Sequence, residues 1–320
     1  MTAGARLDGS IYGAAWRAAR VYFVGLIVAT ACRFAAPPAP ATGPAADIAT
    51  LAGRAFGGRH PGTPGGDSAA VYLARRYAEL RLRPAFRAGC DSAPQCGWSY
   101  LQVFPFENTV AQNVGAIIDG TDPVLRTEYI VIGAHFDHLG QSPDYAFDPQ
   151  HGFAMRPGAD DNASGTAAVL ELARRFASRP IRRSIVVVNF DAEEEGLLGS
   201  RAFVARPPVP GRAIVLMLNF DMIGRLHRSH LLVEGVAEHS PVRLAADRAA
   251  AAAGVRPDFI ADRGLSDHST FLAEKIDVIA LSTGEDVDYH TTTDIPSRLN
   301  LRGVERVIDF AESIVRQRGG

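Results

Sequence analysis

Acidic residues and histidines follow apolar runs at several places in the sequence, and together they have the composition of a metal site. The five motifs are GAHFDHLG (133–140), GADDNASG (158–165), DAEEEGLLGS (191–200), NFDMIG (219–224) and DYHTTTD (288–294). In an open parallel sheet the exits of such runs lie along one edge, where ligands of α/β proteins bind. Imidazole and carboxylate groups without cysteine are typical donors of a hydrolytic zinc site. The sequence therefore predicts a metallohydrolase.

Three of these motifs supply single residues that can bind a metal. His135 and Asp137 form a His-x-Asp pair, in which the imidazole can bind an ion while the carboxylate orients it. Asp221 ends a long apolar run, where a carboxylate is costly unless it is paired or metal-bound. His290 lies in the last motif. Each residue alone is also compatible with an ordinary core or loop position, so a metal site is inferred only from their occurrence together.

Two adjacent acids, Asp160 and Asp161, precede a predicted helix. Asp, Asn and Ser are favoured at helix N-termini, so capping is one explanation. However, two acids exceed what a cap requires. One aspartate can instead bridge two zinc ions with its two oxygens and let them share a water of lowered pKa. The carboxylates also outnumber the ligands of one tetrahedral ion, so two ions are expected.

A run of three glutamates, Glu193, Glu194 and Glu195, follows the strand-like run IVVVNF. A charge run is usually a solvated surface, and that remains the alternative. At a strand exit, however, adjacent side chains project in different directions. One glutamate can then bind metal while its neighbour acts as general base for the attacking water and returns the proton to the leaving amine.

Strands are expected to alternate with helices from Thr127 onward. Apolar runs predict strands at 128–134, 184–190, 213–220, 230–234 and 276–282, and helices at about 164–178, 198–206, 240–253 and 301–317. Before them, a helical pattern from Asp47 to Leu82 is interrupted by PGTPGG (61–66), and residues 98–118 alternate like strands. This alternation predicts an α/β fold, a three-layer αβα sandwich around a mixed, mostly parallel sheet.

The first 46 residues differ in composition from the rest of the chain. Three arginines precede an apolar run from Val21 to Ala31, which ends in small residues before Cys32. This order is typical of an export signal, so residues 1–31 are expected to direct export. An uncleaved anchor and lipid attachment at Cys32 are the alternatives. The Pro/Ala-rich stretch 32–46 is expected to be a tether, which leaves 47–320 as the catalytic domain.

Charge and cysteine content limit the partners and the compartment. The net charge of −2 gives no basic field for nucleic acid. We expect a monomer that meets a membrane only through its signal or lipid anchor. Cys90 and Cys96 form a local pair, which predicts a disulfide bond in an exported, oxidising location. A metal-binding cysteine pair is the alternative.

In this order and spacing, the five motifs resemble those of the co-catalytic dizinc aminopeptidases of metallopeptidase family 28. That family also includes glutamate carboxypeptidase, glutaminyl cyclases and the catalytically silent transferrin receptor. The resemblance covers about residues 130–300 strongly and the region from 47 more loosely. It implies a zinc exopeptidase fold, two zinc ions per chain and a peptide substrate.

The resemblance also implies particular roles. Its metal ligands are His135, Asp161, Glu194, Asp221 and His290. His135 and Asp221 would bind one zinc, Glu194 and His290 the other, and Asp161 would bridge them. The family's Asp-Asn-x-Ser-Gly register selects Asp161 over Asp160. A non-proline cis peptide bond is expected after Asp161.

Three further residues receive roles from the resemblance. Glu193 is expected to be the general base, because the register Ala-Glu-Glu-x-Gly selects it and Glu194 over Glu195. Asp137 is expected to orient His135, and Tyr289 to donate to the tetrahedral oxyanion. The loop 141–156 is expected to shape the pocket, although simple surface packing explains its composition equally well.

The expected reaction is hydrolysis of N-terminal peptide bonds by a dizinc-bound hydroxide. Three alternatives use the same fold. A glutaminyl cyclase is disfavoured because all five ligand positions match. A carboxypeptidase or dipeptidase needs basic residues for a terminal carboxylate, and Arg156, Arg225 and Arg263 lie near the motifs. A non-catalytic binding protein is least favoured, since none of the five ligands or the base is missing.

Overall fold

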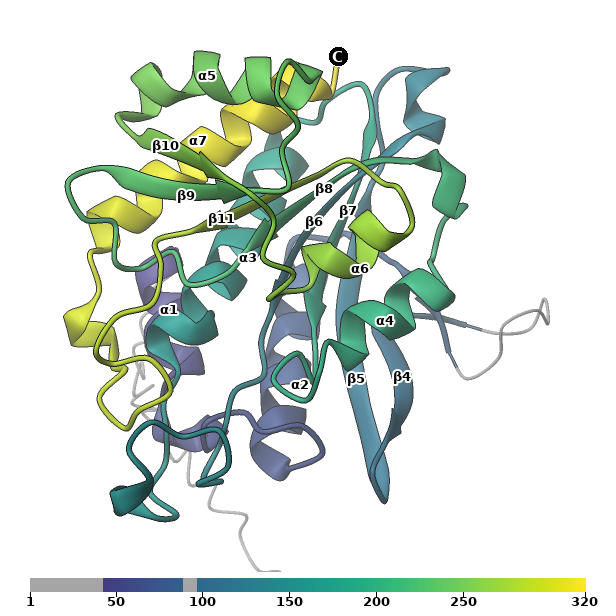
Figure 1. Ribbon diagram of the computed structural model, residues 1–320. Coiled ribbons are helices and arrows are strands. Elements are labelled where there is room, and N and C mark those ends of the chain that lie inside the picture. Colours follow the sequence, from purple (N-terminus) through teal and green to yellow (C-terminus); the bar gives the residue numbers. More distant parts are fainter. Residues whose placement is uncertain (1–42, 89–96) are drawn as a thin grey trace, which may run out of the picture. The chain divides into compact units, whose positions relative to one another are not determined.

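The computed structural model describes residues 43–88 and 97–320 and contains one large mixed β-sheet (Figure 1). Its strand order is β1-β5-β7-β6-β8-β11-β9-β10, and β4 also pairs with β5. The nine strands are β1 (Arg83–Pro84), β4 (Leu101–Phe106), β5 (Thr109–Ile118), β6 (Tyr129–His135), β7 (Ser184–Phe190), β8 (Ile214–Phe220), β9 (His230–Glu234), β10 (Arg256–Ile260) and β11 (Val278–Ser282). Two short strands, β2 (Phe86–Arg87) and β3 (Trp98–Ser99), form a separate small sheet.

The centre of the large sheet is parallel. β7, β6, β8 and β11 are consecutive neighbours and run in the same direction. Antiparallel pairs flank them, with β5 beside β7 and β9 beside β11. Every residue of β7 is buried, as expected for a central strand covered on both faces. The carboxyl ends of the four parallel strands therefore lie along one edge.

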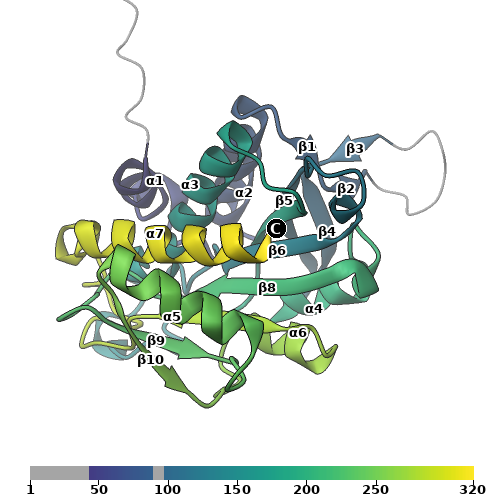
Figure 2. The ribbon, with the colours of Figure 1, turned by 90° about the horizontal axis from the view of Figure 1, so that it is seen from above.

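Helices cover both faces of the sheet (Figure 2). One face packs against α1 (Pro44–Leu51), α2 (Pro64–Glu79), α3 (Gly165–Ser178), α5 (Pro241–Ala253) and α7 (Leu301–Arg318). The other packs against α4 (Leu198–Ala205) and α6 (His268–Ala273). Alternate residues of β6 point to opposite sides: Ile130 and Ile132 join the first core and Val131 the second. The predicted α/β sandwich is confirmed.

The predicted interruption of the helical pattern from Asp47 to Leu82 is present, but it lies earlier than expected. α1 ends at Leu51, and α2 begins at Pro64, inside the segment PGTPGG. Thr63 caps this helix, because its Oγ1 accepts from the backbone N–H of Gly66 at 3.3 Å, and proline is favoured at the first helical position. Strand β10 was not predicted. It has a proline and several polar residues, a composition tolerated only at a sheet edge.

The expectations for the N-terminal region and the cysteines fall on residues outside those described. These are the export signal, the tether up to residue 42, lipid attachment at Cys32, and the pairing of Cys90 with Cys96. They stay predictions. Among the described residues, no helix combines the length and apolar character needed to cross a membrane.

Candidate metal centre

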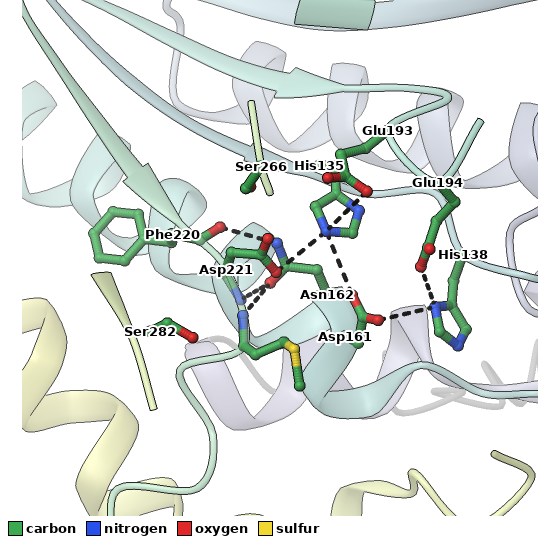
Figure 3. A network of polar contacts seen from close by, with 12 residues as sticks. His135, His138, Asp161, Asn162, Glu193, Glu194, Phe220, Asp221, Ser266 and Ser282 are labelled. Atoms are coloured by element: carbon green, nitrogen blue, oxygen red, sulfur yellow. Dashed lines mark hydrogen bonds and ion pairs between the residues drawn. The ribbon is translucent and has the colours of Figure 1, made fainter. Parts of the chain in front are cut away.

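The acidic and histidine motifs meet at the carboxyl edge of the parallel strands, and Figure 3 shows residues of four of these motifs. His135 is the last residue of β6, and Asp221 directly follows β8. Glu193 and Glu194 lie in the turn after β7, and His290 lies in the loop after β11. Because these four strands are neighbours and parallel, residues far apart in sequence are brought together, as the motifs predicted.

Asp161 lies at the centre of this cluster. Its Oδ1 is 3.4 Å from His135 Nε2, and its Oδ2 is 3.1 Å from His290 Nε2. One carboxylate thus faces two imidazoles, each with a different oxygen. The peptide bond between Asp161 and Asn162 is cis, as the resemblance implied. This is the arrangement expected of a ligand that bridges two ions.

The neighbours of Asp161 hold it in place. The carboxylate of Asp294 accepts the backbone N–H groups of Asp160 and Asp161 at 2.9 and 3.1 Å. Asn162 Oδ1 accepts the backbone N–H of Gly165, the first residue of α3, at 2.9 Å. Asp160 Oδ1 accepts from the backbone N–H of Gly224 at 2.6 Å. Asp160 therefore has a structural role, whereas Asp161 is the acid that reaches the cluster.

One side of the cluster, here called the His135 side, comprises His135, Asp221 and Glu193. His135 Nε2 lies 3.3 Å from Asp221 Oδ1 and 4.0 Å from Glu193 Oε2. His135 is buried, but the Asp221 side chain is 20% exposed. This side is consequently the one that opens toward solvent.

The other side, here called the His290 side, comprises His290, Glu194 and His138. His290 Nε2 lies 3.1 Å from Glu194 Oε2. His290 Nδ1 contacts the backbone oxygen of Tyr145 at 2.9 Å, and since a carbonyl only accepts, Nδ1 carries the proton and Nε2 is free to bind a cation. His138, which the sequence interpretation missed, places Nδ1 2.8 Å from Glu194 Oε1.

Asp137 has a wider role than predicted. Its backbone oxygen is the hydrogen-bond partner of His135 Nδ1 at 3.3 Å, and its Oδ1 lies 3.6 Å from the same nitrogen, so Asp137 is placed to orient that ring. Its two carboxylate oxygens also accept the backbone N–H groups of Glu193 and Glu194, at 3.1 and 3.2 Å. Asp137 therefore fixes the turn that presents both glutamates. This contact could not be predicted from either motif alone, because it joins two of them.

The two glutamates have opposite electrostatic surroundings. Burial raises the pKa of Glu193 well above its usual range; His135 opposes this effect, and nearby Asp221 and Glu194 raise the pKa further. Burial would also raise the pKa of Glu194, but contacts from His138 and His290 outweigh burial and hold it well below its usual range. Glu194 is therefore an ionised ligand candidate, whereas Glu193 can hold a proton.

A buried arginine links the two loops that carry the cluster. Arg59 is fully buried, and its guanidinium donates to the backbone oxygens of Phe136, Leu51, Pro157 and Gly158 at 2.5–2.9 Å. Phe136 adjoins His135, and Gly158 precedes the segment of Asp161. Arg59 was missed because it lies before the region of regular strand–helix alternation.

A cavity of about 330 Å³ adjoins the His135 side. Its lining includes Asp221 together with Phe147, Ser266, His268 and Tyr289. The Tyr289 ring stacks on His290 with 3.8 Å between ring centroids, and Phe147 packs edge-on against Tyr289. The loop 141–156 thus supplies a wall of the cavity, in agreement with the expectation that it shapes the pocket.

The donor set fits zinc. Bonds of about 2.0–2.1 Å place the donor atoms of one tetrahedral zinc ion about 3.3 Å apart. The separations between His135 Nε2 and the oxygens of Asp161 and Asp221 are 3.4 and 3.3 Å. Those between His290 Nε2 and the oxygens of Asp161 and Glu194 are both 3.1 Å. Buried imidazoles and carboxylates at these spacings are therefore compatible with two adjacent ions.

A mixed α/β sheet with such donors at the carboxyl edge of its parallel strands defines the zinc exopeptidase class of folds. The chain matches the model of Peptidase family M28 over residues 113–315, and it belongs to this family.

Curated relatives match part of the chain. A probable leucine aminopeptidase from Arthroderma otae is 36% identical over 130 residues, which cover 38% of this chain and 32% of that protein. Among the curated relatives considered, the chain spans 24% to 32% of their length. Their activities therefore bear on this protein only as proposals.

Solved structures share the fold over most of the chain. BSAP, a zinc aminopeptidase from Bacillus subtilis, superposes with a TM-score of 0.67 and 19% identity, covering 86% of this chain and 94% of that one. A glutaminyl cyclase from Bacteroides thetaiotaomicron superposes with a TM-score of 0.68 and 20% identity, covering 85% and 96%. The fold therefore does not distinguish these two reactions.

Proposed function

We propose that the protein is a zinc-dependent aminopeptidase that hydrolyses N-terminal peptide bonds. The observation that carries this proposal is the single carboxylate of Asp161, which faces His135 with one oxygen and His290 with the other. Asp221 adds an acid on the first side and Glu194 on the second. His135 and Asp221 would hold one zinc ion, His290 and Glu194 the other, and Asp161 would bridge them.

Glu193 is the proposed general base. Zinc, when bound, supplies a water of lowered pKa and polarises the scissile carbonyl. Glu193 faces the cluster without being needed as a ligand, and its raised pKa suits a group that accepts a proton and then releases it. Glu193 would take the proton of the attacking water and return it to the leaving amine. Tyr289, in the wall of the cavity, would donate to the developing oxyanion.

The arginines near the site favour a free amine over a terminal carboxylate as the recognised group. Arg156 is fully buried and pairs with Asp148 at 2.7 Å, so it holds the loop 141–156 together. Arg225 is surrounded by four aspartates, namely Asp160, Asp286, Asp288 and Asp294. Arg263 lines the cavity, but it is paired with Glu234 at 2.7 Å.

The cavity also carries acidic character, because Asp221 and Glu285 line it in addition to Glu234. A protonated α-amine is therefore better matched to this cavity than a carboxylate. These contacts favour an aminopeptidase over a carboxypeptidase. The same acids favour an aminopeptidase over a glutaminyl cyclase, and so do the candidate metal ligands on both sides of Asp161.

The protein is also proposed to act outside the cytoplasm. The support is the sequence of residues 1–31 and the cysteine pair Cys90 and Cys96. Intact-mass measurement of the mature protein would show loss of the signal, any lipid on Cys32, and a mass two hydrogens lower for a disulfide. An uncleaved, fully reduced chain from the native host would contradict export.

Metal analysis combined with a substrate panel tests the proposed function. The purified protein is expected to bind two zinc ions per chain and to cleave aminoacyl chromogenic substrates with a free α-amine. N-blocked analogues of the same substrates should not be cleaved. Activity only on blocked or carboxylate-terminal peptides would move the assignment to a carboxypeptidase or dipeptidase. Cyclisation of N-terminal glutamine without peptide cleavage would move it to a glutaminyl cyclase.

A further inference from the structure

A third imidazole lies on the His290 side of the cluster. His138 is fully buried, and its ring centroid is 5.5 Å from that of His290. Its Nδ1 lies 2.8 Å from Glu194 Oε1 and 3.7 Å from Asp161 Oδ2. The same nitrogen thus faces oxygens of two different proposed ligands (Figure 3).

We propose that His138 is a fourth protein ligand, through Nδ1, of the ion held by Asp161, Glu194 and His290. This inference rests on the proposed two-zinc site. One donor atom from each of the four residues lies within 4.8 Å of all the others. Asp161 Oδ2 lies 3.7 Å from His138 Nδ1 and 3.1 Å from His290 Nε2, near the roughly 3.3 Å expected between donors of one tetrahedral zinc ion. Glu194 faces His138 with Oε1 at 2.8 Å and His290 with Oε2 at 3.1 Å.

A hydrogen bond from His138 to Glu194 is the competing explanation. Such a bond requires one acceptor, and it would not require Nδ1 to lie near Asp161 as well. The polypeptide brings His138 to this point from the loop after β6, opposite His290 from the loop after β11. Imidazoles from two different loops therefore lie beside the carboxylates of Asp161 and Glu194. This is the arrangement expected of an ion whose four ligands all come from the protein.

The proposal makes the two sides unequal. On the His290 side four protein residues would bind the ion, whereas the His135 side would have three, namely His135, Asp221 and the other oxygen of Asp161, with Glu193 kept as the base. Structural zinc sites have four protein ligands, whereas catalytic sites have three and keep an open position for water or substrate. Of the proposed ligands, Asp221 alone lines the 330 Å³ cavity, which agrees with access from the side of Asp221. The substrate amine would therefore be bound from the His135 side.

Two matched substitutions separate a ligand from a hydrogen-bond donor. Asn and Asp each place a polar atom where His138 Nδ1 stands. His138→Asn keeps an N–H donor but provides a poor zinc ligand, and His138→Asp provides a carboxylate ligand but no donor. If His138 is a ligand, the Asn variant loses affinity for one ion by more than about 100-fold, beyond the 10–100-fold cost of an outer hydrogen-bond partner, and the Asp variant recovers most of it.

The measurements are zinc affinity by chelator competition and the visible absorption of the cobalt(II)-substituted protein, which reports coordination number. A change of cobalt spectrum in the Asn variant, reversed in the Asp variant, supports the proposal. The opposite order of affinities, or two unchanged ions in the Asn variant, overturns it. His60→Asn, outside the cluster, is the control and should keep both ions. A wild-type protein that binds fewer than two zinc ions would instead contradict the proposed function itself.

Discussion

The His135 side and the His290 side of the centre are built from the same residue types but differ in charge and access. On the His290 side, two imidazoles contact Glu194 and hold its pKa far below the usual range. On the His135 side, one imidazole faces Glu193, whose pKa is far above the usual range because it is buried among other acids. Adjacent residues therefore suit different proposed tasks: Glu194 that of an ionised metal ligand, and Glu193 that of a proton carrier beside the cavity.

Loss of the proton carrier should have the largest effect and should leave the metal in place. Glu193→Gln removes the base but retains the size of the side chain, so kcat is expected to fall about 10²–10⁴-fold with both zinc ions retained. Steady-state kinetics and metal analysis on the same sample measure both. Glu195→Gln is the matched control, because Glu195 pairs with His60 at the rim. If Glu193→Gln lost an ion, Glu193 would be a ligand and the division of tasks would be wrong.

The sequence predicted the members of the centre that lie at strand exits, because the parallel ends of β6, β7, β8 and β11 necessarily share one edge. His135, Asp221 and His290 were found in this way, whereas Asp161 was selected over Asp160 by the family's Asp-Asn-x-Ser-Gly register. His138 was not, since the third residue beyond a strand can point anywhere until the loop is folded. Its only signal was a second histidine in the His-Phe-Asp-His motif.

Contacts between loops also could not be predicted from the sequence. Arg59 donates to backbone oxygens. Because every residue has a backbone oxygen, the residue types do not indicate which ones accept from Arg59. The start of α2 was predicted at the wrong position, because PGTPGG both breaks a helix and, from Thr63 onward, begins one. Local composition cannot separate these two uses.

Arg59 tests whether the two sides depend on a common support. Arg59→Met leaves four buried carbonyls without their donor, so the free energy of unfolding should fall by at least about 3 kcal/mol. Both ions should be weakened together, because Arg59 holds the loops of His135 and Asp161. Denaturant unfolding and chelator competition measure these effects, and Arg59→Lys keeps the charge if the first variant does not fold. Arg54→Met, an exposed arginine of the same segment, is the control. Loss of only one ion in Arg59→Met would show that the sides are supported separately.

Substitution of one acid on each side tests their inequality directly. Asp221→Asn removes a ligand from the side with three donors, and we expect one ion to bind at least about 100-fold more weakly while the other is unchanged. Glu194→Gln leaves Asp161, His290 and His138 in place, so its ion should be weakened less. Zinc affinities from chelator competition give both values. Equal losses in the two variants would indicate two equivalent sites and would remove the basis for assigning the substrate to one side.

The smallest expected effect concerns a buried acid on the His135 side that no proposed ligand set includes. Burial raises the pKa of Asp267 to about 7, and the charges of Asp137 and Asp221 raise it while His135 opposes them. The unfolded chain has a pKa of about 3.9 for this group, so the folded state binds the proton more tightly. Its contribution to stability is then present at low pH and is lost as pH rises from about 4 toward 7.

Metal-free wild type should therefore lose stability relative to Asp267→Asn by about 1 kcal/mol between pH 5 and pH 6, because the limiting slope is about 1.4 kcal/mol per pH unit. Above pH 7 the difference should stop growing. Thermal unfolding of both proteins in chelator at a series of pH values gives the comparison. A difference that is constant with pH would mean that Asp267 is ionised throughout this range. The negative charges on the His135 side would then be stabilised as well as those on the His290 side.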